Sequence, residues 1–186
     1  MAYCTVAEIR ERLSLGGSQD DNLISDLIDT ADSLIDNYTG RTFNSSTETR
    51  KFDGNDSNKL LLNDDLISMS AIEIDAVSKT ITDFILYPLN SSPKRFIIAT
   101  LEKGEIFTKG RANIEITGDW GYCALASLPR DIWNACVKLV TTEYIRRQSA
   151  SAHAIIDERI GYVAFADGLP KDVQQILSHY QLPSFS

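Results

Sequence analysis

The sequence predicts an α+β protein, mainly a helical bundle of about four helices with a small antiparallel β region inserted into it. Apolar residues recur at helical spacing near both ends of the 186-residue chain, whereas the middle alternates apolar and polar residues between Gly, Asn, Ser and Pro breaks. Prolines stand where the two C-terminal helices are expected to begin. We expect an N-terminal helix pair in residues 1–43 and a β-rich region in 44–122. Residues 123–186 supply a long helix and a C-terminal segment that pack with 1–43 as one helical domain.

The first two helices are predicted from their caps and their apolar spacing. Thr5-Val6-Ala7-Glu8 has the pattern of a capping box, and Gly16-Gly17 ends the short helix that follows. A second, amphipathic helix is expected from about Asp20 to Thr39, with Gly40 as its C-cap. Its apolar positions are Leu23, Ile24, Leu27, Ile28, Ala31, Leu34, Ile35 and Tyr38.

The middle third carries strand and turn signals. Ile72-Glu73-Ile74-Asp75 and Ile114-Glu115-Ile116 alternate apolar and polar residues, and Asn90-Ser91-Ser92-Pro93 is one of the breaks. Short runs of this kind, rich in β-branched and aromatic residues, are typical of antiparallel strands. The predicted strands are residues 51–54, 59–62, 67–74, 84–87, 96–101 and 113–117.

A third helix is expected from Pro129 to about Ala150. Its apolar residues cover more than half of its circumference, so it needs neighbours on several sides. Before it, residues 118–122 are interpreted as the joint between the sheet and the helices, because their glycines allow a turn. The aromatic residues there either wedge the two layers together or cover a neighbouring subunit. The candidates for this core or subunit-interface role are Trp120, Tyr122, Trp133 and Tyr144.

The C-terminal part predicts an extended segment or strand at 158–166 and then a helix from Leu169 to Tyr180. The helix has an apolar stripe at i, i+3, i+4 and i+7, formed by Val173, Ile176, Leu177 and Tyr180. A helix of about twelve residues is marginal alone. The stripe is therefore expected to lie either on its own subunit or on a partner, and Phe185 near the end of the chain is a further apolar residue that needs a partner.

Composition and charge exclude several classes of function. The net charge is −8 and the pI is near 4.7, which argues against affinity for nucleic acid or for an anionic membrane surface. No apolar run approaches the ~20 residues of a membrane span, and the N-terminus lacks the layout of a signal peptide. Cys4, Cys123 and Cys136 form neither a disulfide framework nor a zinc pattern, so a reducing compartment is expected.

No catalytic, metal or cofactor site is predicted, and the protein is not expected to be an enzyme. The histidines, His153 and His179, have no second ligand at metal spacing. Residues 53–58 resemble a calcium loop only faintly, because the glycine at the sixth position and the Glu at the twelfth are missing, and a hairpin turn is the better interpretation. A small hydrolase that uses Asp119 or Asp64 with His153 stays as a less favoured alternative.

The second helix carries an unusual acidic stripe, which stands out because no Lys or Arg occurs between Arg12 and Arg41. Exposed helix faces normally mix charges of both signs. The stripe is interpreted either as an idle solvent-exposed face or as a surface that repels DNA or docks a basic partner. As candidates for residues that line a DNA channel we take Asp21, Asp26, Asp29, Asp32 and Asp36.

The order of these segments resembles the head–tail connector (adaptor) proteins of tailed bacteriophages. TVAEIRERLSL followed by DDNLISDLIDTADSLIDNYTGRTF is similar to their N-terminal helix pair, and TRKFDG with KLLLNDDLISMSAIEID is similar to the strands that follow. ITGDWGY, LPRDIWNACVKLV and DERIGYVAFADGLPKDVQQILSHY match the rest in order. The resemblance covers nearly the whole chain, although Val163 to Ala166 are apolar where a longer polar segment is expected.

The resemblance implies a non-enzymatic ring protein, commonly of twelve subunits, that lies beneath the portal and extends the DNA channel. Its implied partners are the portal protein and a stopper or tail-completion protein. DNA passes through without specific binding, no membrane is involved, and the location is the virion neck, with host cytoplasm during assembly. The C-terminal stripe, from Val173 to Tyr180 together with Phe185, becomes a portal-docking candidate. The alternative is a DNA-packaging, terminase-like DNA-binding subunit, against which the acidic second helix speaks.

Overall fold

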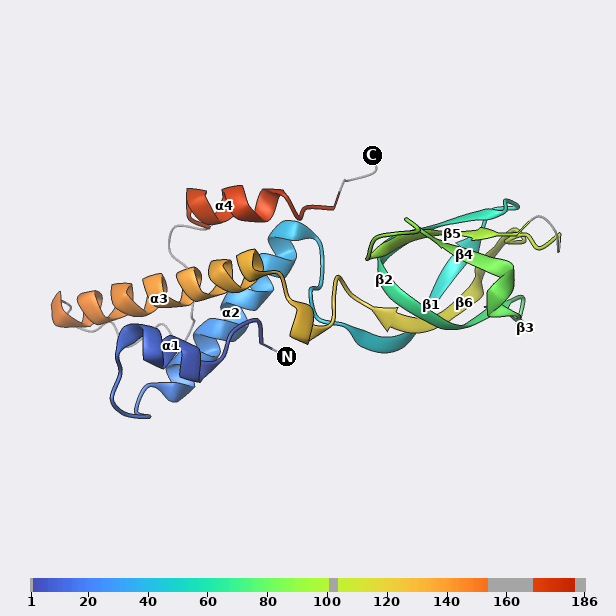
Figure 1. Cartoon of the computed structure of the whole chain (residues 1–186). Coiled ribbons are helices and arrows are strands. Elements are labelled where there is room, and N and C mark those ends of the chain that lie inside the picture. The colour runs from blue at the N-terminus through green and yellow to red at the C-terminus, as the bar shows by residue number, and fades with distance from the viewer. Residues whose placement is uncertain (1, 101–103, 154–168, 183–186) are drawn as a thin grey trace. The chain divides into compact units, whose positions relative to one another are not determined.

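The computed structural model describes residues 2–100, 104–153 and 169–182. The chain divides into two compact units, one formed by Met1–Gly40 with Leu128–Ser186 and the other by Arg41–Ser127. The first contains helices α1 to α4 and the second contains the β-sheet (Figure 1). Each unit is described by itself.

The helical unit contains α1 (Val6–Leu13), α2 (Asp21–Thr39), α3 (Arg130–His153) and α4 (Lys171–Ser178). The predicted capping box is present, since the Thr5 hydroxyl accepts a hydrogen bond from the Glu8 N–H and the Glu8 carboxylate accepts one from the Thr5 N–H. α1 ends at Ser14 and α2 at Gly40, both in the left-handed conformation. These local signals set the ends of the two N-terminal helices.

The core of the helical unit forms where α2 packs against α3, with α1 and α4 against the same pair. One face of each helix supplies it, as the 3.6-residue period requires. Burial of each large aliphatic side chain stabilises the unit by roughly 2 kcal/mol. The buried residues include Ile9, Ile24, Leu27, Ile28, Ala31, Ile35, Ile132, Ala135, Leu139, Val140, Val173 and Leu177.

The β unit is a six-stranded antiparallel sheet in the order β1-β6-β2-β5-β4, with β3 paired to β2 (Figure 1). The strands are β1 (Ser46–Gly54), β2 (Lys59–Ile74), β3 (Val77–Lys79), β4 (Phe84–Tyr87), β5 (Lys94–Ala99) and β6 (Gly110–Trp120). Among its described residues the unit also has the 3₁₀ turns η1 (Ile81–Asp83) and η3 (Leu125–Ser127). Within β2 the register shifts between Leu61 and Leu66, so its first half pairs with β5 and its second half with β6.

One face of this sheet encloses an apolar core. Successive side chains of a strand point to opposite faces, and the inward positions of all the long strands carry aliphatic or aromatic residues. The core cluster contains Leu60, Leu62, Leu66, Ile72, Ile74, Phe84, Ile97, Ala99, Phe107, Ile114, Ile116 and Trp120. The sheet therefore has a full hydrophobic core within its own unit.

The prediction of a mainly helical bundle with a small β region is wrong, because the sheet is large and builds a core of its own. The sequence predicts a break after residue 62, since Asn63-Asp64-Asp65 has turn propensity. In the structure β2 runs through these residues, because Asp64 and Asp65 are paired with Arg50 and Arg41. β1 also begins earlier than predicted, at Ser46. The strand predicted at 158–166 lies outside the described residues.

Candidate functional site

The described residues hold no group of three or more His, Cys, Asp or Glu side chains placed to bind a metal ion, and no described helix is long and apolar enough to span a membrane. The faint calcium loop forms the turn between β1 and β2. Its carboxylates accept backbone hydrogen bonds, Asp53 from Ala112 at 2.6 Å and Asp56 from Lys109 at 2.7 Å. These contacts explain the acidic residues as turn formers.

The residues of the hydrolase alternative have other partners. The Asp119 carboxylate accepts hydrogen bonds from Thr47 and Ser68, at 2.6 and 2.8 Å, which lower its pKa below the ordinary value. Asp64 forms an ion pair with Arg50 at 2.7 Å. His153 belongs to α3 in the helical unit, and its side chain lies outside the described set. A carboxylate held by two hydroxyl donors is a weak base, so Asp119 is a poor candidate for acid–base catalysis.

The acidic stripe of α2 is split by the fold. Asp26 and Asp29 are exposed, whereas Asp21, Asp32 and Asp36 are partly buried. Asp21 lies 3.5 Å from the Arg10 guanidinium of α1. Of the five channel-lining candidates, only Asp26 and Asp29 therefore have exposed side chains, and the channel-lining role itself stays a prediction.

Asp32 and Asp36 bind the N-terminal segment. The backbone N–H of Tyr3 donates to Asp32 at 3.0 Å, the Tyr3 hydroxyl donates to Asp36 at 2.5 Å, and the Cys136 thiol donates to Asp32 at 3.3 Å. Burial raises the pKa of Asp32 to about 6, against these hydrogen bonds, which lower it. Burial also raises the pKa of Asp36. The two carboxylates therefore hold the N-terminal segment against α2, a role that helical spacing alone does not predict.

Two of the aromatic candidates lie in the helical unit. Tyr144 is 2% exposed, and its hydroxyl donates to Asp20 at 2.7 Å. Trp133 is half-buried; its indole N–H donates to Glu8 at 3.0 Å, and the Arg130 guanidinium lies 3.6 Å from the ring centroid. Tyr144 is a core residue, whereas Trp133 is half-buried beneath a guanidinium, and its role at a subunit interface stays a prediction.

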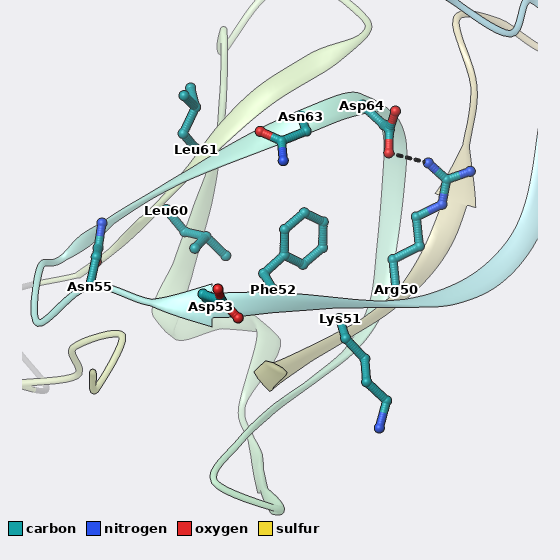
Figure 2. Close-up of a pocket in the computed structure, with 9 residues that line it drawn as sticks. All are labelled: Arg50, Lys51, Phe52, Asp53, Asn55, Leu60, Leu61, Asn63 and Asp64. Atoms are coloured by element: carbon teal, nitrogen blue, oxygen red, sulfur yellow. Dashed lines mark ion pairs between the residues drawn. The ribbon is translucent and has the colours of Figure 1, made fainter. Parts of the chain in front are cut away.

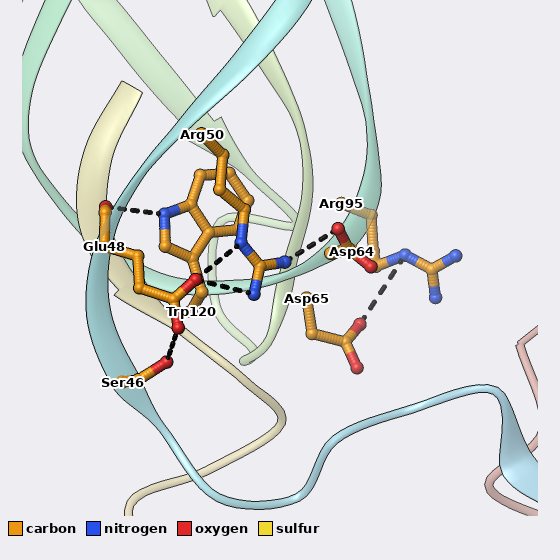
Figure 3. Close-up of polar contacts among 7 residues, drawn as sticks. All are labelled: Ser46, Glu48, Arg50, Asp64, Asp65, Arg95 and Trp120. Carbon is orange, nitrogen blue, oxygen red and sulfur yellow. Dashed lines mark hydrogen bonds and ion pairs between the residues drawn. The ribbon is translucent and has the colours of Figure 1, made fainter. Parts of the chain in front are cut away.

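Trp120 lies in the core of the β unit (Figure 3). It is 1% exposed, stacks on Phe52 with ring centroids 5.6 Å apart, and donates its indole N–H to the Glu48 carbonyl at 3.1 Å. The Arg50 guanidinium lies 4.8 Å from its ring centroid and is itself held by Glu48 and Asp64. The sequence predicts a core or interface position for Trp120, and in the structure its side chain is buried inside the β unit.

The turn before α3 starts later than the sequence predicts. Gly118 is inside β6, where a Cβ atom would lie 2.2 Å from the Ser68 carbonyl oxygen, so it permits close strand approach. Gly121, with φ of 135°, is the residue that turns the chain. Tyr122 follows and packs on Phe43, with centroids 5.2 Å apart. The joint therefore begins at Gly121.

A groove opens between β1 and the first half of β2, with a volume of about 660 Å³ (Figure 2). Phe52 and Leu60 point into it, and the Arg50–Asp64 ion pair crosses one end. Its remaining lining residues are Lys51, Asp53, Asn55, Leu61 and Asn63. Among these lining residues there is neither a metal-ligand cluster nor a buried nucleophile.

The outer face of β2, β5 and β4 carries an apolar patch that the sequence analysis missed. Leu61 and Tyr87 flank Phe96 in one register row, and Lys59 and Ile85 flank Ile98 in the next. The Lys59 ammonium borders the patch, 4.1 Å from the centroid of the Phe96 ring. Leu61 is 42% and Ile85 37% exposed, and the rings of Tyr87 and Phe96 stack at 5.2 Å. The unbroken apolar run from Phe84 to Tyr87 was the available signal, because it supplies apolar side chains to both faces. Contiguous exposed apolar residues mark interaction surfaces.

The stripe of α4 divides between core and surface. Val173 and Leu177 are fully buried in the helical unit, whereas Ile176 and Tyr180 are half-buried. The segment after α4 binds the end of α2, with the Leu182 N–H donating to the Thr39 carbonyl at 2.9 Å. The stripe therefore packs mainly on its own subunit. Phe185 lies outside the described residues.

Nearly the whole chain matches one known protein family. The family model for the head completion protein HCP matches residues 2–182. This match confirms the resemblance to head–tail connector proteins drawn from the sequence. No curated protein sequence was found to match the chain.

Solved structures with a similar fold come from gene transfer agent particles. The neck of an empty particle computed with C6 symmetry contains a chain with a TM-score of 0.65 and 15% identity, covering 99% of this chain and 92% of that one. A chain in the virion of the native particle has a TM-score of 0.60 and 18% identity, covering 99% of this chain and 92% of that one. A chain in the neck of the native particle, computed with C12 symmetry, has a TM-score of 0.60 and 15% identity, covering 97% of this chain and 90% of that one. At these identities the comparison shows a common fold across both compact units.

Proposed function

The chain belongs to the head completion protein family, and on this premise we propose that it is a non-enzymatic structural subunit of the neck of a tailed-phage-like particle. The observation that carries the proposal is the family match over residues 2–182, which includes both the helical and the β unit. The fold shared with neck and virion chains of gene transfer agent particles supports the same location. Before incorporation, the subunit is proposed to be in the host cytoplasm.

The subunits are proposed to form a closed ring beneath the portal, with twelve copies as the expected number. A heterologous contact repeated by rotation closes such a ring. The similar neck structures were computed with sixfold and twelvefold symmetry, which supports a ring. The apolar patch on β2, β5 and β4 supplies a surface suited to a neighbouring protein, either the next subunit or a stopper protein.

The charge distribution supports a channel through which DNA slides. The helical unit has 8 basic and 14 acidic residues, for −6, and the β unit has 10 and 12, for −2, which together account for the −8 of the chain. A negative lining repels phosphates and avoids holding the DNA. Asp26 and Asp29, the exposed acids of α2, are the proposed lining residues.

Portal docking is proposed for the remaining accessible part of the C-terminal segment. Ile176 on α4 and Tyr180 in the turn after it are half-buried and can contact a partner without unfolding the helix, which ends at Ser178 and not at Tyr180 as predicted. Phe185 is the proposed anchor beyond them. Because Val173 and Leu177 are already buried, they hold α4 in place and do not themselves serve as docking side chains.

The proposal is tested with DNA-filled heads that carry a portal but lack this protein. Added purified protein is expected to form a ring of density below the portal in electron micrographs and to prevent loss of DNA. Heads whose portal vertex is unchanged at saturating protein, and which still lose DNA, would overturn the neck assignment. In a mobility-shift assay at low salt the free protein is expected to leave duplex DNA unshifted; a shift favours a DNA-packaging role.

A further inference from the structure

Two thiols from opposite ends of the chain meet in the helical unit. Cys4 stands just before α1 and Cys136 lies on α3, yet their sulfur atoms are 3.1 Å apart. The side chains are 2% and 0% exposed. The third cysteine, Cys123, belongs to the β unit, where its thiol lies against the Phe43 carbonyl. The fold thus selects one pair out of three thiols.

We propose that Cys4 and Cys136 are a site of covalent modification, a disulfide cross-link formed by a low-molecular-weight disulfide such as oxidised glutathione. Sulfur atoms in contact need little further movement to reach the length of an S–S bond, about 2.05 Å. The N-terminal segment is already positioned by the bonds of Tyr3 to Asp32 and Asp36. The cross-link therefore preserves the fold and fixes a contact that is otherwise held by hydrogen bonds.

The reaction proceeds in two exchange steps. The Cys4 thiol, exposed when the N-terminal segment opens, loses its proton and attacks one sulfur of oxidised glutathione, which expels a glutathione thiolate. When the segment returns, the Cys136 thiol loses its proton and attacks the Cys4 sulfur, which expels the second glutathione. Two protein thiols are oxidised, one glutathione disulfide is reduced to two thiols, and both protons end on glutathione.

Opening of the N-terminal segment is expected to control the rate. Cys136 is buried and faces Cys4 and the Asp32 carboxylate. Neither neighbour is positively charged, so neither favours the reactive thiolate form of Cys136. The Tyr3 hydroxyl bond to Asp36 holds the segment closed. Loss of this hydroxyl is therefore expected to speed oxidation several-fold while leaving the identity of the cross-link unchanged.

The cross-link closes a loop that contains α1, α2 and the whole β unit. Disulfides that close loops of about 100 residues stabilise by restricting the unfolded chain, and the melting temperature is expected to rise by roughly 10 °C. If the proposed neck location is right, a particle released from a cell passes from reducing to oxidising surroundings, where the cross-link forms. That consequence rests on the proposed function; the cross-link itself does not.

The test uses the full chain, reduced, freed of reductant and incubated with oxidised glutathione. After acid quenching and alkylation, mass spectrometry is expected to find only Cys123 labelled and a Cys4–Cys136 peptide pair. Cys123→Ser serves as the matched control that keeps the cross-link, whereas Cys4→Ser and Cys136→Ser abolish both the cross-link and the rise in melting temperature. Tyr3→Phe gives the faster rate.

Three outcomes would overturn the proposal. The first is that all three thiols are still alkylated after the incubation with oxidised glutathione. The second is that Cys4 forms a stable glutathione adduct that does not react further, and the third is that the disulfide contains Cys123. A parallel incubation in denaturant distinguishes fold-directed pairing from random pairing, since the Cys4–Cys136 product is expected to dominate only in the folded protein. Failure here leaves the neck assignment untouched, because ring formation beneath the portal is measured separately.

Discussion

The helical unit and the β unit differ in what they bury. The β core is a continuous apolar cluster centred on residues such as Trp120, Phe107 and Leu62, and the buried Asp65 beside it is ion-paired with Arg41. The helical unit packs an aliphatic core, but beside it lie the half-buried Asp32, which has no basic partner among its hydrogen bonds to described residues, and two buried thiols in contact. It also carries most of the net charge, −6 against −2.

This difference indicates which unit changes its stability with pH and with oxidants. An apolar core responds to truncation of its side chains and is indifferent to pH or oxidants. A partly buried carboxylate with a raised pKa, and a pair of thiols in contact, respond to both. We therefore expect the helical unit to sense its surroundings and the β unit to act as a rigid support.

The largest expected effect is on the β unit. Trp120→Ala removes a fully buried ring and is expected to lower the free energy of unfolding by about 3–5 kcal/mol. Urea unfolding followed by circular dichroism measures the loss. Trp133 then becomes the single tryptophan and reports the helical unit by fluorescence. If its transition shifts as far as that of the sheet, the two units unfold together and the comparison between them fails.

Truncation in the helical core is expected to come next. Leu177→Ala on α4 is expected to cost about 2–4 kcal/mol, because its side chain is fully buried. Ile176→Ala is the matched control on the neighbouring, half-buried position and is expected to cost less than half as much. Thermal unfolding of both variants measures the difference. Equal effects would mean that α4 is not packed as described.

Asp32→Asn tests the pH sensitivity of the helical unit. The pKa of Asp32 is about 6 in the fold and 3.8 ordinarily, so between these values the folded state binds more protons than the unfolded state. The free energy of unfolding of the unaltered chain therefore falls as pH rises from about 4 to about 6. The variant is expected to show a smaller fall, because only the raised pKa of Asp36 still contributes to it. Relative to its stability at pH 4, the variant is therefore expected to lose less free energy of unfolding by pH 7 than the unaltered chain, by on the order of 1–2 kcal/mol after allowance for partial solvent exposure.

The check for Asp32→Asn is the melting temperature between pH 4 and pH 8. Asp26→Asn, a neutralisation on the exposed face of the same helix, is the control and is expected to follow the unaltered chain throughout. A parallel pH dependence of Asp32→Asn and the unaltered chain would show that the carboxylate is not the source of the fall.

The smallest effect on stability is expected for Asp26→Lys combined with Asp29→Lys. Both side chains are exposed, so the free energy of unfolding is expected to change by less than about 0.5 kcal/mol. Their proposed role predicts instead slower DNA ejection or poorer DNA retention in assembled particles. The variant Asp26→Asn with Asp29→Asn removes the two charges without reversing them. Its DNA ejection and retention are expected to lie between those of the unaltered protein and those of the double Lys variant. Particles of normal infectivity with both Lys residues would rule out the channel-lining role.

The fold was predictable where the signals are local. The capping box at Thr5, the C-cap at Gly40 and the apolar period of α2 depend on residues within one or two turns of one another, and these elements agree with the structure. The sheet was underestimated because β2 continues through Asp64 and Asp65, whose partners Arg50 and Arg41 are distant in sequence. Turn propensity is a local quantity, and it gives way to such ion pairs.

The sequence by itself determined the start of α1, the end of α2, the acidic character and the likeness to head–tail connectors, since each depends on residue type and order along the chain. Only the tertiary structure decided which acids of α2 stay exposed, that Trp120 is a core residue of the sheet, and that Cys4 meets Cys136. The physical reason is that helical spacing defines a face but not its neighbours. The N-terminal segment covers part of the acidic face and α3 brings its thiol there, so residues 132 positions apart share one site.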